Sequence, residues 1–268
     1  MAARPLLLVG CGKMGGALLA GWLDQGVAAA DITVIEPAGP VTAAGVTTIA
    51  EAAALPADYA PAITVVAVKP QTMDQALAPL GGRHAVARGV VLSIAAGKTI
   101  GYFEGVFGAQ TAIVRAMPNT PAAVGRGITV LTANAAVSAA GRQLSGELMS
   151  AVGEVGWIED EALMDAVTAT SGSGPAYVFL LIETLARAAE EAGLEAELAL
   201  RLAQATVSGA GELARLAEEP AAQLRQNVAS PGGTTAAALD VLMAEDGLQS
   251  LMTRAVAAAT QRSRELAG

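Results

Sequence analysis

Near its start the chain contains Pro5-Leu-Leu-Leu-Val-Gly10-Cys-Gly12-Lys-Met-Gly15, a short apolar run that passes into three glycines. Small and apolar residues follow at helical spacing from Lys13 to Gln25. A buried strand, a glycine turn and a helix N-terminus, in this order, are typical of a dinucleotide-binding fold. The first glycine permits the turn, the second lets the backbone approach a pyrophosphate, and the third lets the helix pack closely on the strand. The alternative is that the glycines only make a tight turn.

A carboxylate stands where such a fold places the partner of a ribose. Glu36 ends the next strand-like run, Asp31–Glu36, about twenty residues after Gly15. At this position it can bind both ribose hydroxyls, and its charge would repel a 2′-phosphate. The cofactor is therefore expected to be NADPH or NADH, and Glu36 favours NADH unless Pro37, the next residue, turns its side chain outwards.

Strand-like and helix-like segments alternate through the first part of the chain, which predicts an α/β fold with a Rossmann-type doubly wound parallel sheet. Further strands are expected at Ile63–Val68, Val90–Ala95, Ala112–Ala116 and Ile128–Leu131. After about residue 160 the strong helix formers Ala, Leu, Glu and Arg dominate. Helices are expected there at Glu161–Ala192, Glu195–Glu219, Thr234–Glu245 and Leu248–Leu266. We therefore expect a dinucleotide-binding domain over 1–160 and an all-α substrate-binding and dimerisation domain over 161–268.

The composition argues against several classes of protein. The 268 residues carry a formal charge of −9, 53% are hydrophobic and only 15% are charged, so the chain is not intrinsically disordered. The negative charge argues against nucleic acid as a partner. With one cysteine, Cys11, and one histidine, His84, we expect neither an internal disulfide nor a metal site, which is consistent with a cytoplasmic protein.

The apolar residues also bear on membranes and on assembly. No stretch has the ~20 apolar residues of a membrane span, and the apolar run before Gly10 is too short for a signal peptide. The later helices, notably Ala255–Thr260, are apolar on more than one face. We therefore expect no membrane partner, and we expect the helical domain to pack against a second copy of itself.

Polar residues follow three of the expected strands, at the sheet edge where ligands bind in open α/β folds. They lie in Val68-Lys69-Pro70-Gln71, Ser93–Gly97 and Met117–Pro121. The small residues of the second segment leave room for a flat ring, and Asn119 and Thr120 can hydrogen-bond a carboxamide or a substrate. Each segment alone would be an ordinary turn, but three of them beside a nucleotide loop predict a binding edge.

A second loop, Asn227-Val-Ala-Ser230-Pro231-Gly232-Gly233-Thr234-Thr235, leads directly into an expected helix. Free N–H groups at a helix start, with glycine amides and hydroxyls beside them, form a socket for an anion, and a carboxylate fits it well. The alternative is an ordinary Ser or Thr cap of the helix. Another glycine–serine segment, Ser171–Tyr177, is expected to be a packing turn at the start of a long helix.

With these motifs the chain resembles the pyrroline-5-carboxylate reductases over essentially its whole length. Besides the glycine loop, the resemblance rests on Val68–Pro70, Ser93–Gly97, Arg115–Pro121, Ser171–Tyr177 and, most specifically, Leu224–Asp246. Two positions depart from the family pattern: Lys13, where many relatives have Asn, and Glu36, where many have a hydroxyl residue.

The resemblance implies NAD(P)H-dependent reduction of the cyclic imine 1-pyrroline-5-carboxylate to L-proline, the last step of proline biosynthesis. It also implies a homodimer, which could be part of a larger ring of dimers. By analogy, the second loop binds the substrate carboxylate, and the catalytic residue Thr235 hydrogen-bonds the ring nitrogen. The substrate-binding residues are then Ser230, Gly232, Gly233, Thr234, Thr235 and Glu218. The cofactor-binding residues are Gly10, Cys11, Gly12, Lys13, Met14, Gly15, Glu36, Val68, Lys69, Pro70, Ala95 and Asn119.

Two other functions fit parts of the pattern. A 3-hydroxyacid dehydrogenase has a similar two-domain plan, but alcohol oxidation requires a general base, in such enzymes usually a lysine of the helical domain. The lysines of this chain, Lys13, Lys69 and Lys98, all lie in its first half. A non-catalytic dinucleotide-binding sensor would bind nucleotide without turnover, and the loop at 230–235 argues against it.

Overall fold

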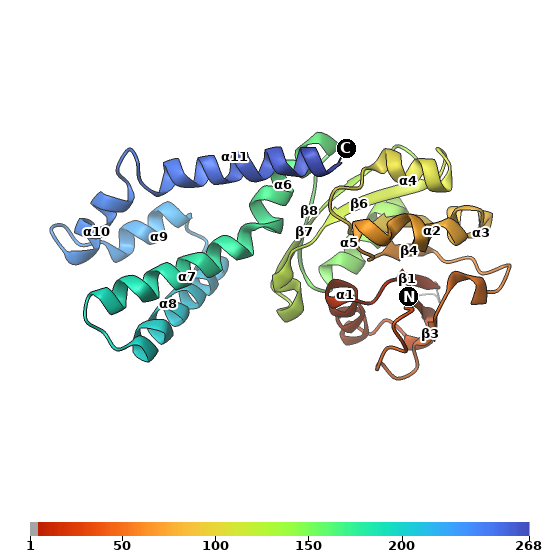
Figure 1. Cartoon of the computed structure of the whole chain (residues 1–268), viewed down its shortest axis with the longest axis horizontal. Helices are drawn as coiled ribbons and strands as arrows, with labels where there is room; N and C mark the ends of the chain where they lie inside the picture. The colour runs from red at the N-terminus through yellow and green to blue at the C-terminus, as the bar shows by residue number, and fades with distance from the viewer. Residues whose placement is uncertain (1–4, 268) are drawn as a thin grey trace. The chain divides into compact units, whose positions relative to one another are not determined.

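The computed structural model describes residues 5–267, with the side chains of residues 5–266. The chain divides into two compact units. The first comprises the residues up to Gly172 together with the C-terminal segment from Thr260, and the second comprises Ser173–Ala259. Figure 1 shows the helices and strands along the chain and labels most of them. All strands of the described residues belong to the first unit, and the second unit is helical.

An eight-stranded sheet forms the centre of the first unit, in the spatial order β3-β2-β1-β4-β5-β6-β7-β8. The strand order reverses between β1 and β4, and ligands of such sheets bind beyond the carboxyl ends of the strands at this point. The strands are β1 Leu6–Val9, β2 Ile32–Ile35, β3 Thr47–Ile49, β4 Ile63–Val66, β5 Val90–Ser93, β6 Ala112–Met117, β7 Gly127–Ala133 and β8 Gly153–Trp157.

The sheet is parallel from β3 to β6, and β7 runs antiparallel to β6. The reason is the length of the connection, residues 118–126, because a parallel crossover needs about a dozen residues or more. This connection contains only a 3₁₀ turn, Thr120–Val124, which ends at Gly125 with a φ of +66°. Strand β8 pairs in parallel with β7, so the last two strands both depart from the fully parallel sheet that was expected.

Helices cover both faces of the sheet, and the residues of its central strands β1 and β4 are therefore buried on both sides. Alternate side chains of β1 belong to two cores, one shared with α1 and α5 and the other with α2 and α4. The Rossmann-type fold predicted for this part of the chain is therefore confirmed. Its helices are α1 Lys13–Asp24, α2 Met73–Gly81, α3 His84–Ala87, α4 Ile100–Phe107, α5 Ala139–Ser150 and α6 Met164–Val167.

The second unit consists of helices that leave many large apolar side chains exposed. In it α7 and α8 pack along each other, and Phe179 on α7 is 59% exposed. A π-helical turn, Thr168–Gly172, precedes α7. The helices are α7 Gly174–Glu191, α8 Ala196–Leu216, α9 Ala221–Val228, α10 Thr234–Leu242 and α11 Leu248–Ala267, and the last turns of α11 belong to the first unit.

Several elements have no counterpart among the predicted ranges, among them β3, β8 and α9. The sequences Thr47-Thr-Ile and Gly153-Glu-Val-Gly-Trp are too short or too rich in glycine to show a strand pattern. The helix expected at Glu161–Ala192 is instead broken into a 3₁₀ turn, α6, the π-helical turn and α7. Among the helices of residues 5–267, none is both long and apolar enough to span a bilayer.

Candidate active site

The glycine loop joins β1 to α1, and its three glycines have different surroundings. Gly10 has a φ of +88°, and a Cβ there would lie 2.8 Å from Val68 Cγ1. A Cβ at Gly15 would lie 2.5 Å from the Gly10 carbonyl oxygen. Gly12 is the N-cap of α1, and a Cβ there would meet no atom within 4 Å. The fold itself therefore requires the first and third glycines, whereas the space beside the second is open to a ligand.

The Glu36 side chain lies against this loop. Its Oε2 accepts a hydrogen bond from the Cys11 amide at 2.7 Å, and its Oε1 accepts one from the Ala38 amide at 3.0 Å. Burial and, to a smaller extent, the Glu36 charge raise the pKa of the Cys11 thiol above its ordinary value. The thiol is therefore uncharged at neutral pH, and the carboxylate supplies the negative charge at this loop.

The lysines predicted at the cofactor site are both exposed. Lys13 is the first residue of α1, and Lys69 is the N-cap of the 3₁₀ turn Pro70–Thr72. The Lys69 carbonyl oxygen accepts hydrogen bonds from the amide and the hydroxyl of Thr72, at 3.0 and 3.1 Å. Met14, beside Lys13, is half-buried and packs against the core.

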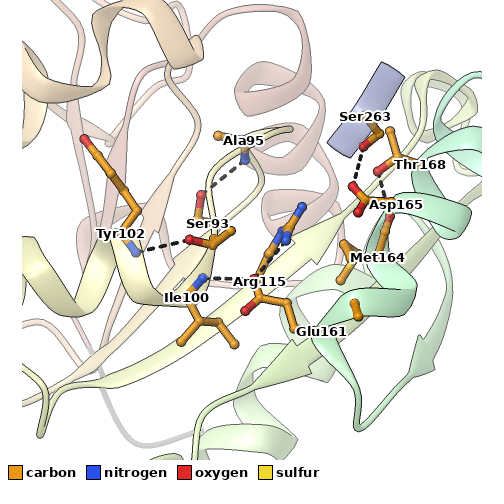
Figure 2. Close-up of polar contacts among 12 residues, drawn as sticks. Ser93, Ala95, Ile100, Tyr102, Arg115, Glu161, Met164, Asp165, Thr168 and Ser263 are labelled. Carbon is orange, nitrogen blue, oxygen red and sulfur yellow. Dashed lines mark hydrogen bonds and ion pairs between the residues drawn. The ribbon is translucent and has the colours of Figure 1, made fainter. Parts of the chain in front are cut away.

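The loop between β5 and α4, residues 94–99, is held at both ends (Figure 2). At its start Ser93 Oγ accepts a hydrogen bond from the Ala95 amide at 3.2 Å. At its end Thr99 caps α4 and accepts one from the Tyr102 amide at 3.3 Å. Between them Gly97 has a φ of +72°. Ala95 is buried, and the loop follows the carboxyl end of β5.

The Asn119 side chain bonds to the protein backbone. Its Oδ1 accepts a hydrogen bond from the Ile128 amide at 2.9 Å, and its Nδ2 donates to the Ser171 carbonyl oxygen at 3.2 Å. These bonds connect the end of β6 with β7 and with the π-helical turn. Asn119 therefore shapes this edge of the sheet through the segments that it joins.

The second predicted loop belongs to the second unit and precedes α10. Gly233 is the N-cap of α10, and no side chain of the described residues caps it. The Gly233 amide donates to the Ser230 carbonyl oxygen at 3.0 Å, and Gly232 has a φ of +68°. The first amides of α10, which include those of Thr234 and Thr235, thus have no capping side chain in residues 5–266, as an anion socket requires.

Glu218, the remaining predicted substrate residue, lies between α8 and α9 and is exposed. It belongs to the second unit, as does the loop before α10.

A cavity of about 760 Å³ lies at the opposite edge of the sheet from the glycine loop. Leu6 and Ile63, the first residues of β1 and β4, line it together with residues of α1 and α5. None of the residues predicted to bind substrate or cofactor lines this cavity, so it is separate from the candidate site.

Sequence reasoning missed an ion pair that borders the loop between β5 and α4. Arg115 Nη1 lies 2.8 Å from Glu161 Oε1, and the Arg115 side chain is 5% exposed (Figure 2). The sequence signal for this pair was Arg115 itself, the single charged residue of the otherwise apolar strand β6. A buried charge requires a partner, so an acidic residue was to be expected beside it. The sequence does not say which of the acidic residues that partner is.

Two family models match the chain. Residues 161–266 match the model described as pyrroline-5-carboxylate reductase dimerisation, and residues 6–97 match one described as NADP oxidoreductase, coenzyme F420-dependent. A pyrroline-5-carboxylate reductase of Pseudomonas aeruginosa is 42% identical over 278 residues, which cover 100% of this chain and 98% of the relative. The chain belongs to the pyrroline-5-carboxylate reductase family.

Other pyrroline-5-carboxylate reductases are similar over the same length. The one from Mycobacterium leprae is 39% identical and covers 97% of this chain, with 96% of its own length matched. The solved structure of the reductase from Coxiella burnetii has a TM-score of 0.91 at 34% identity, with 99% of each chain covered. The Plasmodium falciparum reductase, solved with NADP bound, has a TM-score of 0.84 at 30% identity, with 100% of each chain covered.

The residues around the glycine loop fit a nicotinamide dinucleotide. The open space beside Gly12 and the start of α1, which no side chain of the described residues caps, fit a pyrophosphate. The Glu36 carboxylate, held beside Cys11, fits the hydroxyls of a ribose. The glycine loop and Glu36 can therefore hold a nicotinamide dinucleotide, the class of cofactor that is bound in the Plasmodium falciparum structure.

Proposed function

We propose that the protein reduces 1-pyrroline-5-carboxylate to L-proline with a nicotinamide coenzyme, the last step of proline biosynthesis. The observation that carries the proposal is the match over the full chain to reductases of this name, at up to 42% identity. The uncapped start of α10 supports it, because such a helix end suits the carboxylate of the substrate.

The residues of the chain bind and orient the substrate. The amides before and within the first turn of α10 bind the carboxylate, and the Thr235 hydroxyl accepts a hydrogen bond from the protonated ring nitrogen. Ser230, Gly232, Gly233, Thr234 and Glu218 complete the substrate side. When bound, the reduced nicotinamide supplies a hydride. Because a protonated imine is already electrophilic, catalysis consists mainly of positioning.

For the coenzyme we propose the twelve residues predicted above, from Gly10 to Asn119, and a preference for NADH. The support is the Glu36 carboxylate, whose charge disfavours a 2′-phosphate at the ribose. Val68, Ala95 and Asn119 would shape the nicotinamide side, Asn119 through the backbone segments that it joins.

For the assembly we propose a homodimer through the helical second part of the chain. The match of residues 161–266 to a dimerisation model and the exposed apolar side chains of α7 and α8 support it. The division into a dinucleotide-binding domain over 1–160 and a substrate-binding and dimerisation domain over 161–268 remains a prediction. The same holds for a ring of dimers and for a cytoplasmic location.

The activity is tested by following loss of the nicotinamide absorbance with 1-pyrroline-5-carboxylate, in parallel with NADH and NADPH. We expect oxidation of both, faster with NADH. No oxidation with either coenzyme would remove the proposal.

The role of Thr235 is tested with Thr235→Ala. We expect turnover to fall by about 100-fold, because one positioned hydrogen bond at the reacting group is lost, while the Kd of the dinucleotide stays within about twofold. Thr253→Ala is the matched control, since its hydroxyl bonds within its own helix, to Gln249. Loss of both turnover and dinucleotide binding, or of neither, contradicts the role of Thr235.

A further inference from the structure

We propose that Glu161 is a positioning residue that fixes the start of α4 and, through it, the loop of residues 94–99. This inference rests on the proposed function, in which that loop borders the nicotinamide. Glu161 is 61 positions away from the backbone amide that it binds, and it follows the last strand of the sheet.

The Glu161 carboxylate makes two contacts through one oxygen. Its Oε1 accepts a hydrogen bond from the Ile100 amide at 2.9 Å and one from Arg115 Nη1 at 2.8 Å (Figure 2). Ile100 is the first residue of α4, so its amide has no partner within the helix. A carboxylate at this end also interacts favourably with the helix dipole.

Arg115 holds the carboxylate in place. It lies on β6, and its side chain is 5% exposed, whereas that of Glu161 is 29% exposed. A buried guanidinium without its partner is costly, so the pair resists separation. The bond from Glu161 to Ile100 is therefore tied to the sheet itself.

Other contacts also restrain the loop that Glu161 fixes. Ser93 Oγ holds its first turn through the Ala95 amide, and Thr99 caps α4. Removing the Glu161 carboxylate leaves the Ile100 amide without its partner and frees the end of the loop. The loop then keeps the bond of the Ile94 amide to the Val66 carbonyl oxygen, the Ser93 contact, the Thr99 cap and the neighbouring C-terminal turn.

The same short segment also holds the C-terminal turn. Asp165 Oδ1 accepts a hydrogen bond from Ser263 Oγ at 2.6 Å (Figure 2). In this turn the carbonyl oxygen of Leu266 lies close enough to Gly97 that a Cβ there would be 3.3 Å away. Residues 161–165 thus support the loop twice, once at its end through Glu161 and once from the side through the C-terminal turn.

The first test measures amide hydrogen exchange of residues 94–100 without coenzyme. In Glu161→Ala we expect exchange at least about tenfold faster than in the wild type, because a fixed contact becomes a local opening. Glu161→Gln keeps an acceptor oxygen and should stay within about threefold of the wild type. Glu159→Ala is the matched control, because the Glu159 side chain is 83% exposed in its pair with Arg142.

The second test compares two ligands by calorimetry. In Glu161→Ala the Kd of the reduced dinucleotide should rise about tenfold, because the loop that borders the nicotinamide is no longer held in place. The Kd of ADP-ribose, which lacks the nicotinamide, should stay within about twofold, because the glycine loop and Glu36 are unchanged. Unchanged exchange and an unchanged dinucleotide Kd overturn the inference, and so does an equal rise for both ligands.

Should Glu161→Ala not be recovered as folded protein, Arg115→Met combined with Glu161→Ala replaces it. This double variant removes both charges and leaves no unpaired buried ion, and the same changes in exchange and Kd are expected. Failure of the proposed function is recognised separately. A wild type that binds dinucleotide but does not turn over the imine overturns the function, while the exchange experiment still tests the role of Glu161.

Discussion

Among single residues, Glu36 is the one on which we expect coenzyme choice to depend. Its carboxylate lies against the Cys11 amide, where a 2′-phosphate would bring a like charge close. In Glu36→Ser we expect the ratio of kcat/KM for NADPH to that for NADH to rise at least about tenfold. Steady-state assays with both coenzymes measure the ratio, with the exposed Glu51→Ser as control. An unchanged ratio would show that Glu36 does not discriminate between the coenzymes.

The raised pKa of the Cys11 thiol predicts the direction in which the stability of the protein changes with pH. Its pKa is raised in the folded state, chiefly by burial and then by Glu36, so above about pH 8.5 the unfolded chain loses this proton first. The unfolded state then binds fewer protons than the folded state, and stability falls as pH rises. We expect the free energy of unfolding to decrease between about pH 8 and 10 more steeply in the wild type than in Cys11→Ala. Urea unfolding at each pH measures it, and equal slopes would contradict the prediction.

For the element that joins β1 to α1, two glycine substitutions should separate folding from binding. Gly15→Ala brings a Cβ to 2.5 Å from the Gly10 carbonyl oxygen, a backbone atom. It should destabilise the protein by about 2 kcal/mol, because overpacking forces the backbone to shift. Gly12→Ala meets no atom within 4 Å. It should change stability by less than about 1 kcal/mol and yet weaken dinucleotide binding about tenfold or more.

Thermal unfolding of the two variants measures the change in stability, and calorimetric titration measures the Kd of the dinucleotide. If Gly12→Ala bound the dinucleotide as tightly as the wild type, the pyrophosphate would not lie against this glycine.

The elements that local sequence patterns could predict are those whose residues carry the signal themselves. The apolar run of β1 and the Ala- and Leu-rich helices after residue 160 are of this kind. The direction of β7 was not predictable from its own residues, because it depends on the short connection from β6. The strand β8, Gly153–Trp157, is short and contains two glycines, and it pairs along its length with β7.

The candidate site likewise has parts that local sequence patterns could predict and parts that they could not. The glycine loop and the loop before α10 were predicted because each is a contiguous motif at a helix start. Glu36 was predicted as the partner of a ribose from its place just after β2, whereas its bond to the Cys11 amide is seen only in the structure. The pairing of Arg115 with Glu161 depends on residues 46 positions apart and on the folded sheet, so no local pattern could reveal it.

The whole molecule should be a dimer that depends on the apolar surface of the second unit. Phe179 and Leu213 are 59% and 57% exposed in the single chain. An aspartate at either position would place a charge in the dimer interface, and the dimer Kd should rise at least about 100-fold. Val124→Asp is the control, because Val124 is 75% exposed in the first unit.

Sedimentation over a concentration series measures the dimer Kd of each variant. A dimer as stable in Phe179→Asp and Leu213→Asp as in Val124→Asp would place the interface elsewhere.

The most direct test of the reaction follows one hydride. The protein is incubated with 1-pyrroline-5-carboxylate and a coenzyme that carries two deuterium atoms at C4 of the reduced nicotinamide, and the proline formed is examined by NMR. We predict one deuterium in each proline, on the ring carbon that is bonded to nitrogen and does not bear the carboxylate. Proline without deuterium, or no proline at all, would contradict hydride transfer to the imine.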